Sequence, residues 1–171
     1  MSRTSQIEDF LASAGWPGAD HVTLAADASF RRYERVTRPG ERAVLMDAPP
    51  DREDIRPFIR IASQLSAMGF SAPRLLAEDT GAGFLLLEDL GDATFSRLMD
   101  AGEKALPLYE LATDVLIDLH RAPAADAVPR GTPVYDDALL LTEALLLTEW
   151  YLPAVSGQSA TEAAVAAYRD V

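Results

Sequence analysis

Two adjacent arginines beside a short polar turn are the residues whose types and spacing most suggest chemistry. Arg31 and Arg32 follow a turn of Asp27, Ala28 and Ser29, and the residues after them alternate as in a strand. An arginine can form charge-assisted hydrogen bonds to a phosphate group. The stretch therefore has two interpretations, a hairpin that binds phosphate or an ordinary solvated turn.

Composition and charge limit the function classes. The chain has 171 residues, of which 49% are hydrophobic and 25% charged, as in a globular protein with a buried core. Its formal net charge of -12 argues against a nucleic-acid partner, since a phosphate backbone is bound by a basic surface. The absence of cysteine excludes disulfides and thiolate zinc sites.

The sequence predicts neither a secretion signal nor a membrane span. Its N-terminus, MSRTSQIEDF, contains acidic residues and lacks the apolar core of a signal peptide. The most apolar run, residues 138–155, contains Glu143 and Glu149, which would be costly inside a bilayer. We therefore expect a soluble, cytoplasmic protein with no membrane partner.

Alternating and apolar runs predict five short strands in the first part of the chain. Pro39-Gly40 predicts a turn between strands, and the stretch 80-TGAG-83 predicts a hairpin. The predicted strands are residues 21–24, 33–37, 43–47, 73–77 and 84–88.

Two helices are predicted among these strands. Ser5 and Glu8 have the spacing of a capping box that begins a helix, and Gly15 predicts its end. The second helix follows Pro50 and is expected to end at Gly69. Its first turn is expected to hold three acidic side chains that complement the helix dipole: Asp51, Glu53 and Asp54.

From Thr94 onward the pattern is helical only. Helices are predicted near residues 95–99, 107–120 and 137–152, and a last helix is predicted to start near Ser159 or Thr161. The order of elements predicts an α+β fold in two parts. A sheet lobe, residues 1–90, is followed by part of a helical lobe, residues 91–171, and the two join at 88-EDLGD-92.

Four stretches of the sheet lobe together resemble the aminoglycoside phosphotransferase and choline kinase family. They are 27-DASFRRYERV-36, 44-VLMDAPP-50, 69-GFSAPRLLAED-79 and 84-FLLLEDLGD-92. Within the family they are most similar to the N-acetylmuramate/N-acetylglucosamine kinases of peptidoglycan recycling. The stretch 143-EALLLTEWYLPAV-155 is similar to the first helices of the family's C-lobe. The resemblance implies a protein-kinase-like fold: a five-stranded antiparallel N-lobe with one main helix, then the start of a helical C-lobe.

The resemblance implies an ATP site made of three segments. One loop would cover the phosphates, and in it we expect contacts from Ser29, Phe30, Arg31 and Arg32. The linker of Glu88, Asp89 and Leu90 would hydrogen-bond the adenine edge through its backbone. Met46 lies near the position where many kinases have a phosphate-binding lysine, and the only lysine here is Lys104. Either an arginine replaces that lysine or the nucleotide is held in another way.

The family's catalytic residues have no match in this chain. The resemblance implies a His-x-Asp loop, a following asparagine and a later aspartate, which together orient the acceptor and bind Mg²⁺. His21 leads to Thr23 and His120 leads to Ala122, so neither fits. We expect the loop beyond Val171. No catalytic or metal-binding residue is therefore assigned to this chain, and by itself it is expected to be inactive.

Three functions remain open on the sequence alone. The first is the N-terminal portion of a kinase that uses ATP and Mg²⁺ to phosphorylate the anomeric hydroxyl of an amino sugar, with the remainder of its own C-lobe as missing partner. The second is the same reaction on an aminoglycoside or a choline-type alcohol. The third is a naturally short, non-catalytic kinase-like binding module.

Overall fold

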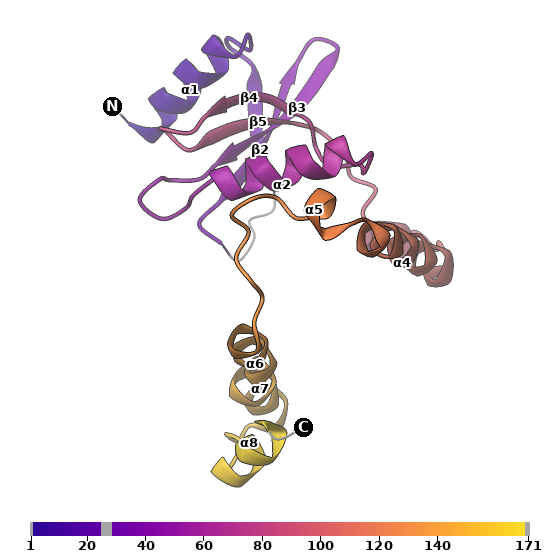
Figure 1. Cartoon of the computed structure of the whole chain (residues 1–171). Coiled ribbons are helices and arrows are strands. Elements are labelled where there is room, and N and C mark those ends of the chain that lie inside the picture. The colour runs from indigo at the N-terminus through magenta and orange to yellow at the C-terminus, as the bar shows by residue number, and fades with distance from the viewer. Residues whose placement is uncertain (1, 25–28, 170–171) are drawn as a thin grey trace. The chain divides into compact units, whose positions relative to one another are not determined.

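The computed structural model describes residues 2–24 and 29–169, and the chain divides into two compact units (Figure 1). The first unit is Met1–Arg130 and the second is Gly131–Val171. The predicted lobe boundary at residue 90 falls just after the last strand, and the three helices that follow belong to the first unit.

A five-stranded sheet forms the centre of the first unit, and all of its strand pairs are antiparallel. The strand order is β1-β2-β3-β5-β4, so β5 lies between β3 and β4. The strands are β1 (Asp20–Thr23), β2 (Arg32–Arg38), β3 (Glu41–Asp47), β4 (Leu75–Asp79) and β5 (Phe84–Glu88). This arrangement confirms the α+β class and the five-stranded antiparallel sheet.

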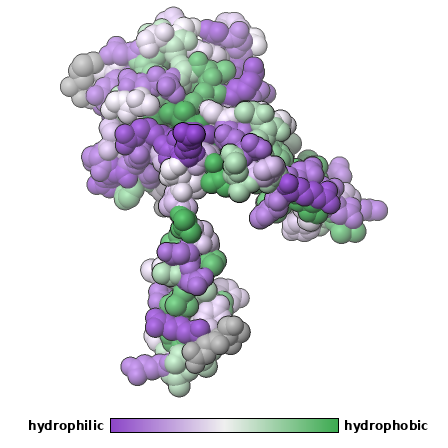
Figure 2. All heavy atoms as spheres, viewed as in Figure 1, coloured by the Kyte–Doolittle hydropathy of each residue, from purple (hydrophilic) through white to green (hydrophobic). Residues whose placement is uncertain are grey.

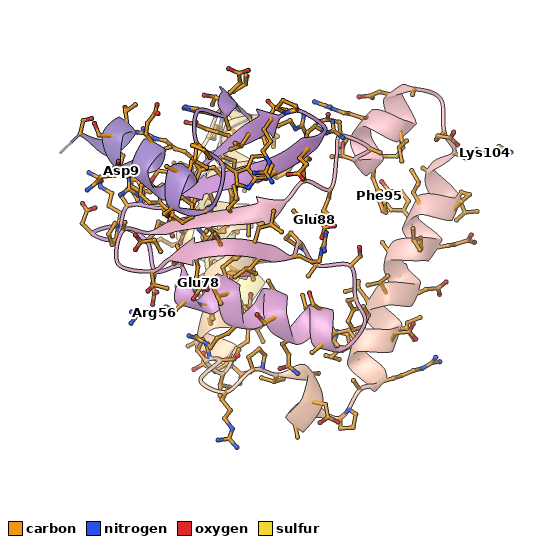
Figure 3. The ribbon with its side chains drawn as sticks, turned by 90° about the horizontal axis from the view of Figure 1, so that it is seen from above. Asp9, Arg56, Glu78, Glu88, Phe95 and Lys104 are labelled. Atoms are coloured by element: carbon orange, nitrogen blue, oxygen red, sulfur yellow. The ribbon has the colours of Figure 1, made fainter. Side chains whose placement is uncertain are left out.

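One helix covers each face of the sheet. Successive side chains of a strand point to opposite faces, so Leu86 packs in one core layer and Leu87 in the other. On the first face Phe10 stacks on Phe84, with 5.4 Å between the ring centroids. The covering helices, on opposite sides of the sheet in Figure 3, are α1 (Arg3–Ser13) and α2 (Arg56–Ala67).

Helix α1 begins earlier than predicted. Ser2 has an extended backbone, and its hydroxyl accepts a hydrogen bond from Ser5 N at 3.2 Å. Ser5 already lies inside the first turn, so the predicted capping box of Ser5 and Glu8 is wrong. The cap is the serine three residues earlier.

Helix α2 begins later than predicted. It starts at Arg56 with Pro57 beside it, and proline suits the first turn of a helix because its missing N–H is not needed there. The prediction that three acidic side chains lie in this turn is wrong. Asp51, Glu53 and Asp54 all precede the helix, which has no acidic residue in its first turn.

The helices after the sheet bury few side chains. In the first unit these are α3 (Phe95–Asp100), α4 (Ala105–Arg121) and α5 (Ala124–Ala127), and none contains a buried residue. The second unit consists of α6 (Asp137–Leu146), the π-helical turn η1 (Leu147–Tyr151), α7 (Leu152–Ser156) and α8 (Glu162–Arg169). Among its described residues only Leu145 and Thr148 are buried, and Figure 2 shows apolar side chains at its surface.

One helical run in the described residues, Asp137–Ser156, is long and apolar enough to cross a membrane by length and composition. Core helices of soluble proteins meet the same criterion. Glu143 and Glu149 lie within this run, and each would be costly in a bilayer. The expectation of no membrane partner stays a prediction.

Gly83 connects the β4–β5 turn to the segment before α2 through a backbone hydrogen bond. Ala48 N donates a hydrogen bond to Gly83 O at 2.9 Å. The φ of Gly83 is +75°, in the left-handed region, and a Cβ there would lie 1.9 Å from Ala48 O. Both the backbone conformation and the close approach therefore require glycine.

We expect Gly83→Ala to lower the free energy of unfolding by about 2 kcal/mol or more, because it combines a strained backbone with a clash against main-chain atoms. Gly81→Ala is the matched control, since the nearest atom to its new Cβ is Asp79 Oδ1 at 3.4 Å and its φ lies outside the left-handed region. Urea unfolding of both variants measures the difference. Equal losses would contradict this explanation.

Candidate functional site

A groove of about 320 Å³ opens where β5 runs into the linker, residues 88–92. Leu24, Val44 and Leu87 contribute apolar surface, and the linker forms a polar rim. Val44 lies opposite both Leu87 and Arg35 in the strand ladders, so these three residues form one row on the α2 face of the sheet. An apolar wall beside a strip of backbone suits a flat heteroaromatic ring.

The linker turns its acidic side chains toward the protein. Glu88 pairs with Arg74, with Nε and Oε2 3.1 Å apart, and the Asp89 side chain is only 4% exposed. Leu90 is 59% exposed. Within the part of the chain that the structure describes, the main-chain N–H and C=O of Leu90 form no hydrogen bond to another protein group. The linker therefore offers backbone groups to a ligand in the groove.

Arg35 fixes the linker to the sheet. Its guanidinium donates to both oxygens of Asp89, at 2.9 and 3.2 Å, and to both oxygens of Asp92, at 2.9 and 3.1 Å. Gly91 N also donates to Asp89 at 2.9 Å, and Arg97 of α3 pairs with Asp92 at 3.1 Å. We call Arg35, Asp89 and Asp92 the linker clamp. It connects β2 to the linker, and Arg97 connects the linker clamp to α3.

The linker clamp lowers the pKa of both carboxyls. Burial raises the pKa of Asp89, but hydrogen bonds from Gly91 N and Arg35 more than offset it, so the pKa lies below the ordinary 3.8. The hydrogen bond from Arg35 is the largest cause of the lowered pKa of Asp92. A depressed folded-state pKa contributes stability above the unfolded-state pKa, and this stability is lost as pH falls through the folded-state pKa.

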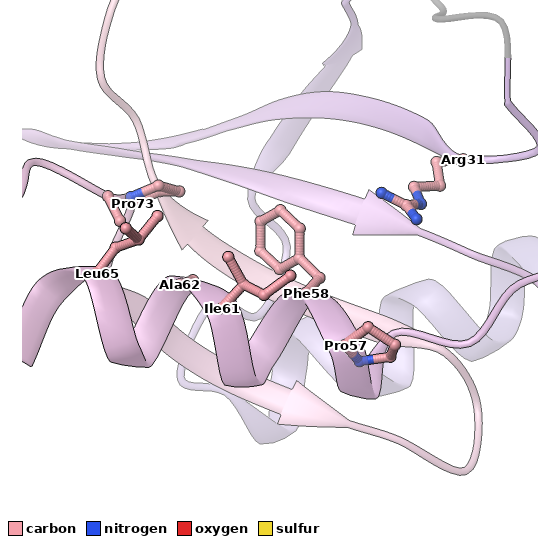
Figure 4. A pocket seen from close by; sticks show the side chains of 8 residues that line it. Arg31, Pro57, Phe58, Ile61, Ala62, Leu65 and Pro73 are labelled. Carbon is pink, nitrogen blue, oxygen red and sulfur yellow. The ribbon is translucent and has the colours of Figure 1, made fainter. Parts of the chain in front are cut away.

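A second groove lies along α2 and adjoins the first, since Phe58 and Pro73 line both. Ile61 and Leu65 add apolar surface to it, and Arg31 lies at one end (Figure 4). We call it the α2 groove; its volume is about 260 Å³. A single cation at the end of an apolar groove is a suitable contact for an anionic part of a ligand.

The two predicted arginines lie on different faces of the sheet. Tyr33 packs against the α2-face core, so the residue before it, Arg32, points to the α1 face by strand alternation. Arg31 precedes β2, and its Nε donates to Glu53 Oε2 at 3.3 Å. Of the pair, only Arg31 lines either groove.

The remaining predicted residues divide into three groups. Asp27 lies outside the described residues. Ser29 and Phe30 are exposed, and the Ser29 hydroxyl accepts a hydrogen bond from Arg31 N at 3.1 Å. Met46 is completely buried in the α2-face core and lines neither groove. Its side chain is therefore a packing group in this structure, although its strand position lies next to the grooves.

Sequence reasoning missed two residues of this region, Arg35 and Glu53. Arg35 shares a strand face with Tyr33, where the alternation of β2 would lead one to expect an apolar side chain. A charged residue at this position of β2 was the signal from which a role for Arg35 could have been inferred. Glu53 was assigned to a helix turn, and its long-range contacts have no local signature.

The described residues offer no metal centre. Across residues 2–24 and 29–169, no group of three or more His, Asp or Glu side chains could hold a metal ion. The ligand set expected for Mg²⁺ is therefore not found here, and we assign no step to a metal in this region.

Comparison with known proteins gives a family match over most of the chain. Residues 20–170 match the sequence model described as "Phosphotransferase enzyme family". This range includes the whole sheet, both grooves and the linker clamp.

Similar individual proteins carry the name N-acetylmuramate/N-acetylglucosamine kinase. Identity is 40% to the one from Pseudomonas aeruginosa, over 86% of this chain and 43% of the relative. It is 37% to the one from Pseudomonas putida, over 97% and 48%, and 36% to the one from Neisseria meningitidis, over 94% and 48%. The chain spans about half the length of the curated relatives it matches.

We expect Arg35→Ala to lower the free energy of unfolding at neutral pH by about 2 kcal/mol, because the buried Asp89 would lose two hydrogen bonds and keep only Arg42, at 3.7 Å, as a cation. Arg56→Ala is the matched control. Arg56 forms a similar pair with Asp54, at 2.7 Å, but both side chains are exposed and local, so no measurable loss is expected.

The effect of Arg35→Ala should also depend on pH. Since the pKa of Asp89 is depressed in the folded protein, the difference between wild type and variant should shrink as pH falls below 3.8. Urea unfolding at about pH 6 and about pH 3 measures this difference. A difference that does not change with pH would contradict the electrostatic role of the linker clamp.

Proposed function

The chain belongs to the phosphotransferase enzyme family, and on this premise we propose that it carries the nucleotide-binding part of an ATP-dependent sugar kinase. The acceptor we propose is the anomeric hydroxyl of N-acetylmuramate or N-acetylglucosamine, and the site of action is the cytoplasm. The name shared by the relatives supports this acceptor class.

The observation that carries the proposal is the groove at the linker. Adenine needs an apolar surface for its ring and hydrogen-bonding groups for its edge. Val44 and Leu87 would supply the surface, and the main-chain groups of Leu90, which have no hydrogen-bond partner among the described residues, would supply the hydrogen bonds. Recognition through the backbone depends on where the linker lies, and the bidentate contacts of Arg35 fix that position.

The triphosphate would extend from the linker groove toward the α2 groove, where Arg31 is the cation. The two grooves meet at Phe58 and Pro73. β3 contains no lysine, its Arg42 lines neither groove, and Met46 is buried, so Arg31 is the replacement that we propose. A guanidinium matches a phosphate in geometry and stays charged at any physiological pH.

We propose that the residues that deprotonate the acceptor hydroxyl and bind Mg²⁺ correspond to the portion of the relatives that this chain does not cover. That part amounts to about half of each relative, since this chain covers 43% to 48%. The chain by itself is then expected to give no sugar-dependent turnover.

The experiment is a coupled assay of ADP release by the full-length protein, with amino sugars, aminoglycosides and choline as acceptors. We expect release with N-acetylmuramate or N-acetylglucosamine, and a product whose phosphorus couples to the anomeric proton in NMR. Release only with an aminoglycoside or choline would move the function to that acceptor class. ATP binding without turnover on any acceptor would favour a non-catalytic binding module.

A further prediction separates the two arginines. Arg31→Ala should raise the KM for ATP by about tenfold or more, since a charge-assisted phosphate contact is lost. Arg32→Ala should have an effect below about twofold, because its side chain points to the opposite face. Steady-state kinetics with varied ATP measures both, and the exposed Arg60→Ala on α2 controls for the loss of charge. A larger effect of Arg32→Ala than of Arg31→Ala would contradict the assignment.

A further inference from the structure

One carboxylate joins the residues just before β2 to the segment just before α2. Glu53 Oε1 accepts a hydrogen bond from Phe30 N at 3.2 Å, and Glu53 Oε2 accepts one from Arg31 Nε at 3.3 Å. The two donors belong to consecutive residues of the predicted phosphate loop. In addition, the guanidinium of Arg52 lies 4.6 Å from the centroid of the Phe30 ring.

Glu53 is itself held in a fixed place. Its N–H donates to Pro49 O at 2.9 Å, and Ala48 N donates to Gly83 O at 2.9 Å. Two residues after Glu53, Ile55 is buried in the α2-face core. The Glu53 side chain is only 15% exposed. The sheet and the core under α2 therefore anchor this segment from both sides.

The Glu53 carboxylate is one of two groups that act on the Arg31 side chain, and the Tyr33 hydroxyl is the other. Arg31 lies at the end of the α2 groove beside Pro57 and Phe58 (Figure 4). Partial burial lowers the pKa of Arg31, but the Tyr33 hydroxyl and the Glu53 carboxylate raise it by more, so the net pKa is above the ordinary arginine value. The guanidinium is thus partly buried, and Glu53 binds it through Nε.

We propose that Glu53 is a positioning residue that holds the Arg31 guanidinium toward the phosphates of a bound nucleoside triphosphate. The inference rests on the proposed function, because it explains how the proposed nucleotide site orients Arg31, its phosphate-binding cation. A free arginine side chain loses considerable rotamer entropy when it binds an anion. If Glu53 already binds the guanidinium through Nε before the ligand arrives, less rotamer entropy is lost on binding. The other N–H groups of the guanidinium can then bind phosphate.

The test compares Glu53 variants of the full-length protein by ATP titration and steady-state kinetics. Glu53→Ala should raise the Kd and KM for ATP about fivefold and leave kcat unchanged, because orientation of a ground-state contact is lost. Glu53→Gln keeps an oxygen acceptor of the same reach and should restore both values to within about twofold of wild type. Asp51→Ala, an exposed carboxylate in the same segment, should change neither.

A double variant separates positioning from a purely structural role. If Glu53 acts through Arg31, Arg31→Ala with Glu53→Ala has the same KM for ATP as Arg31→Ala alone. Three results would overturn the proposal. The effects of the two substitutions on the KM for ATP could multiply in the double variant, or Glu53→Ala could leave this KM unchanged. Glu53→Ala could also lower the KM, which would show that the carboxylate competes with phosphate for Arg31. Where Glu53→Ala fails to fold, Glu53→Met, which keeps about the same length and removes both oxygen acceptors, gives the same comparison alone and combined with Arg31→Ala.

The outcome for the wild-type protein distinguishes the two levels of proposal. If wild type binds no ATP, the proposed function fails and the role of Glu53 fails with it. If wild type binds ATP and Glu53→Ala binds it equally well, only the positioning role is overturned.

Discussion

The burial of β3 and β5 on both faces is the constraint on which the rest of the first unit depends. Four consecutive residues of β5, Phe84 to Leu87, are buried, and alternation sends them in turn to the α1 and α2 layers. A slip of one residue would exchange the two layers along the whole strand. The register is therefore strongly determined, and it brings Arg35, Val44 and Leu87 into one row at the mouth of the linker groove.

On this sheet, arginine–carboxylate pairs connect segments that are distant in sequence. Arg3 of α1 pairs with the buried Asp47 at the end of β3, and Arg35 pairs with Asp89 in the linker. Arg31 and Glu53 join the start of β2 to the segment before α2. In the two pairs around the grooves the carboxylate is partly or nearly fully buried, so the geometry is more fixed than in a surface pair. An acidic protein thus uses several of its few cations to place backbone and side chains around two grooves.

The parts that the sequence predicted are those with a local signal. Strand alternation and the turn residues predicted all five strands, whereas the adenine contact at Glu88 to Leu90, which family resemblance implied, stays a prediction. The predicted starts of α1 and α2 were wrong because residues that can begin a helix lie close together in each case. Ser2 caps α1 instead of Ser5, and Pro57 lies in the first turn of α2. Arg35 and Glu53 act through partners 54 and 22 positions away, a separation that no local pattern encodes.

The two halves of the chain differ in how their helices are stabilised. Helices α1 and α2 bury side chains against the two faces of the five-stranded sheet. In contrast, α4 buries no side chain and exposes Leu106, Leu111 and Leu116. In the second unit Trp150 and Tyr151 are exposed within the π-helical turn. Short helices gain most of their stability from tertiary packing, and exposed apolar faces of this extent are typical of contact surfaces. The proposed nucleotide site therefore lies in the part of the first unit that has a closed core, and the exposed faces of the later helices provide apolar surface for contacts.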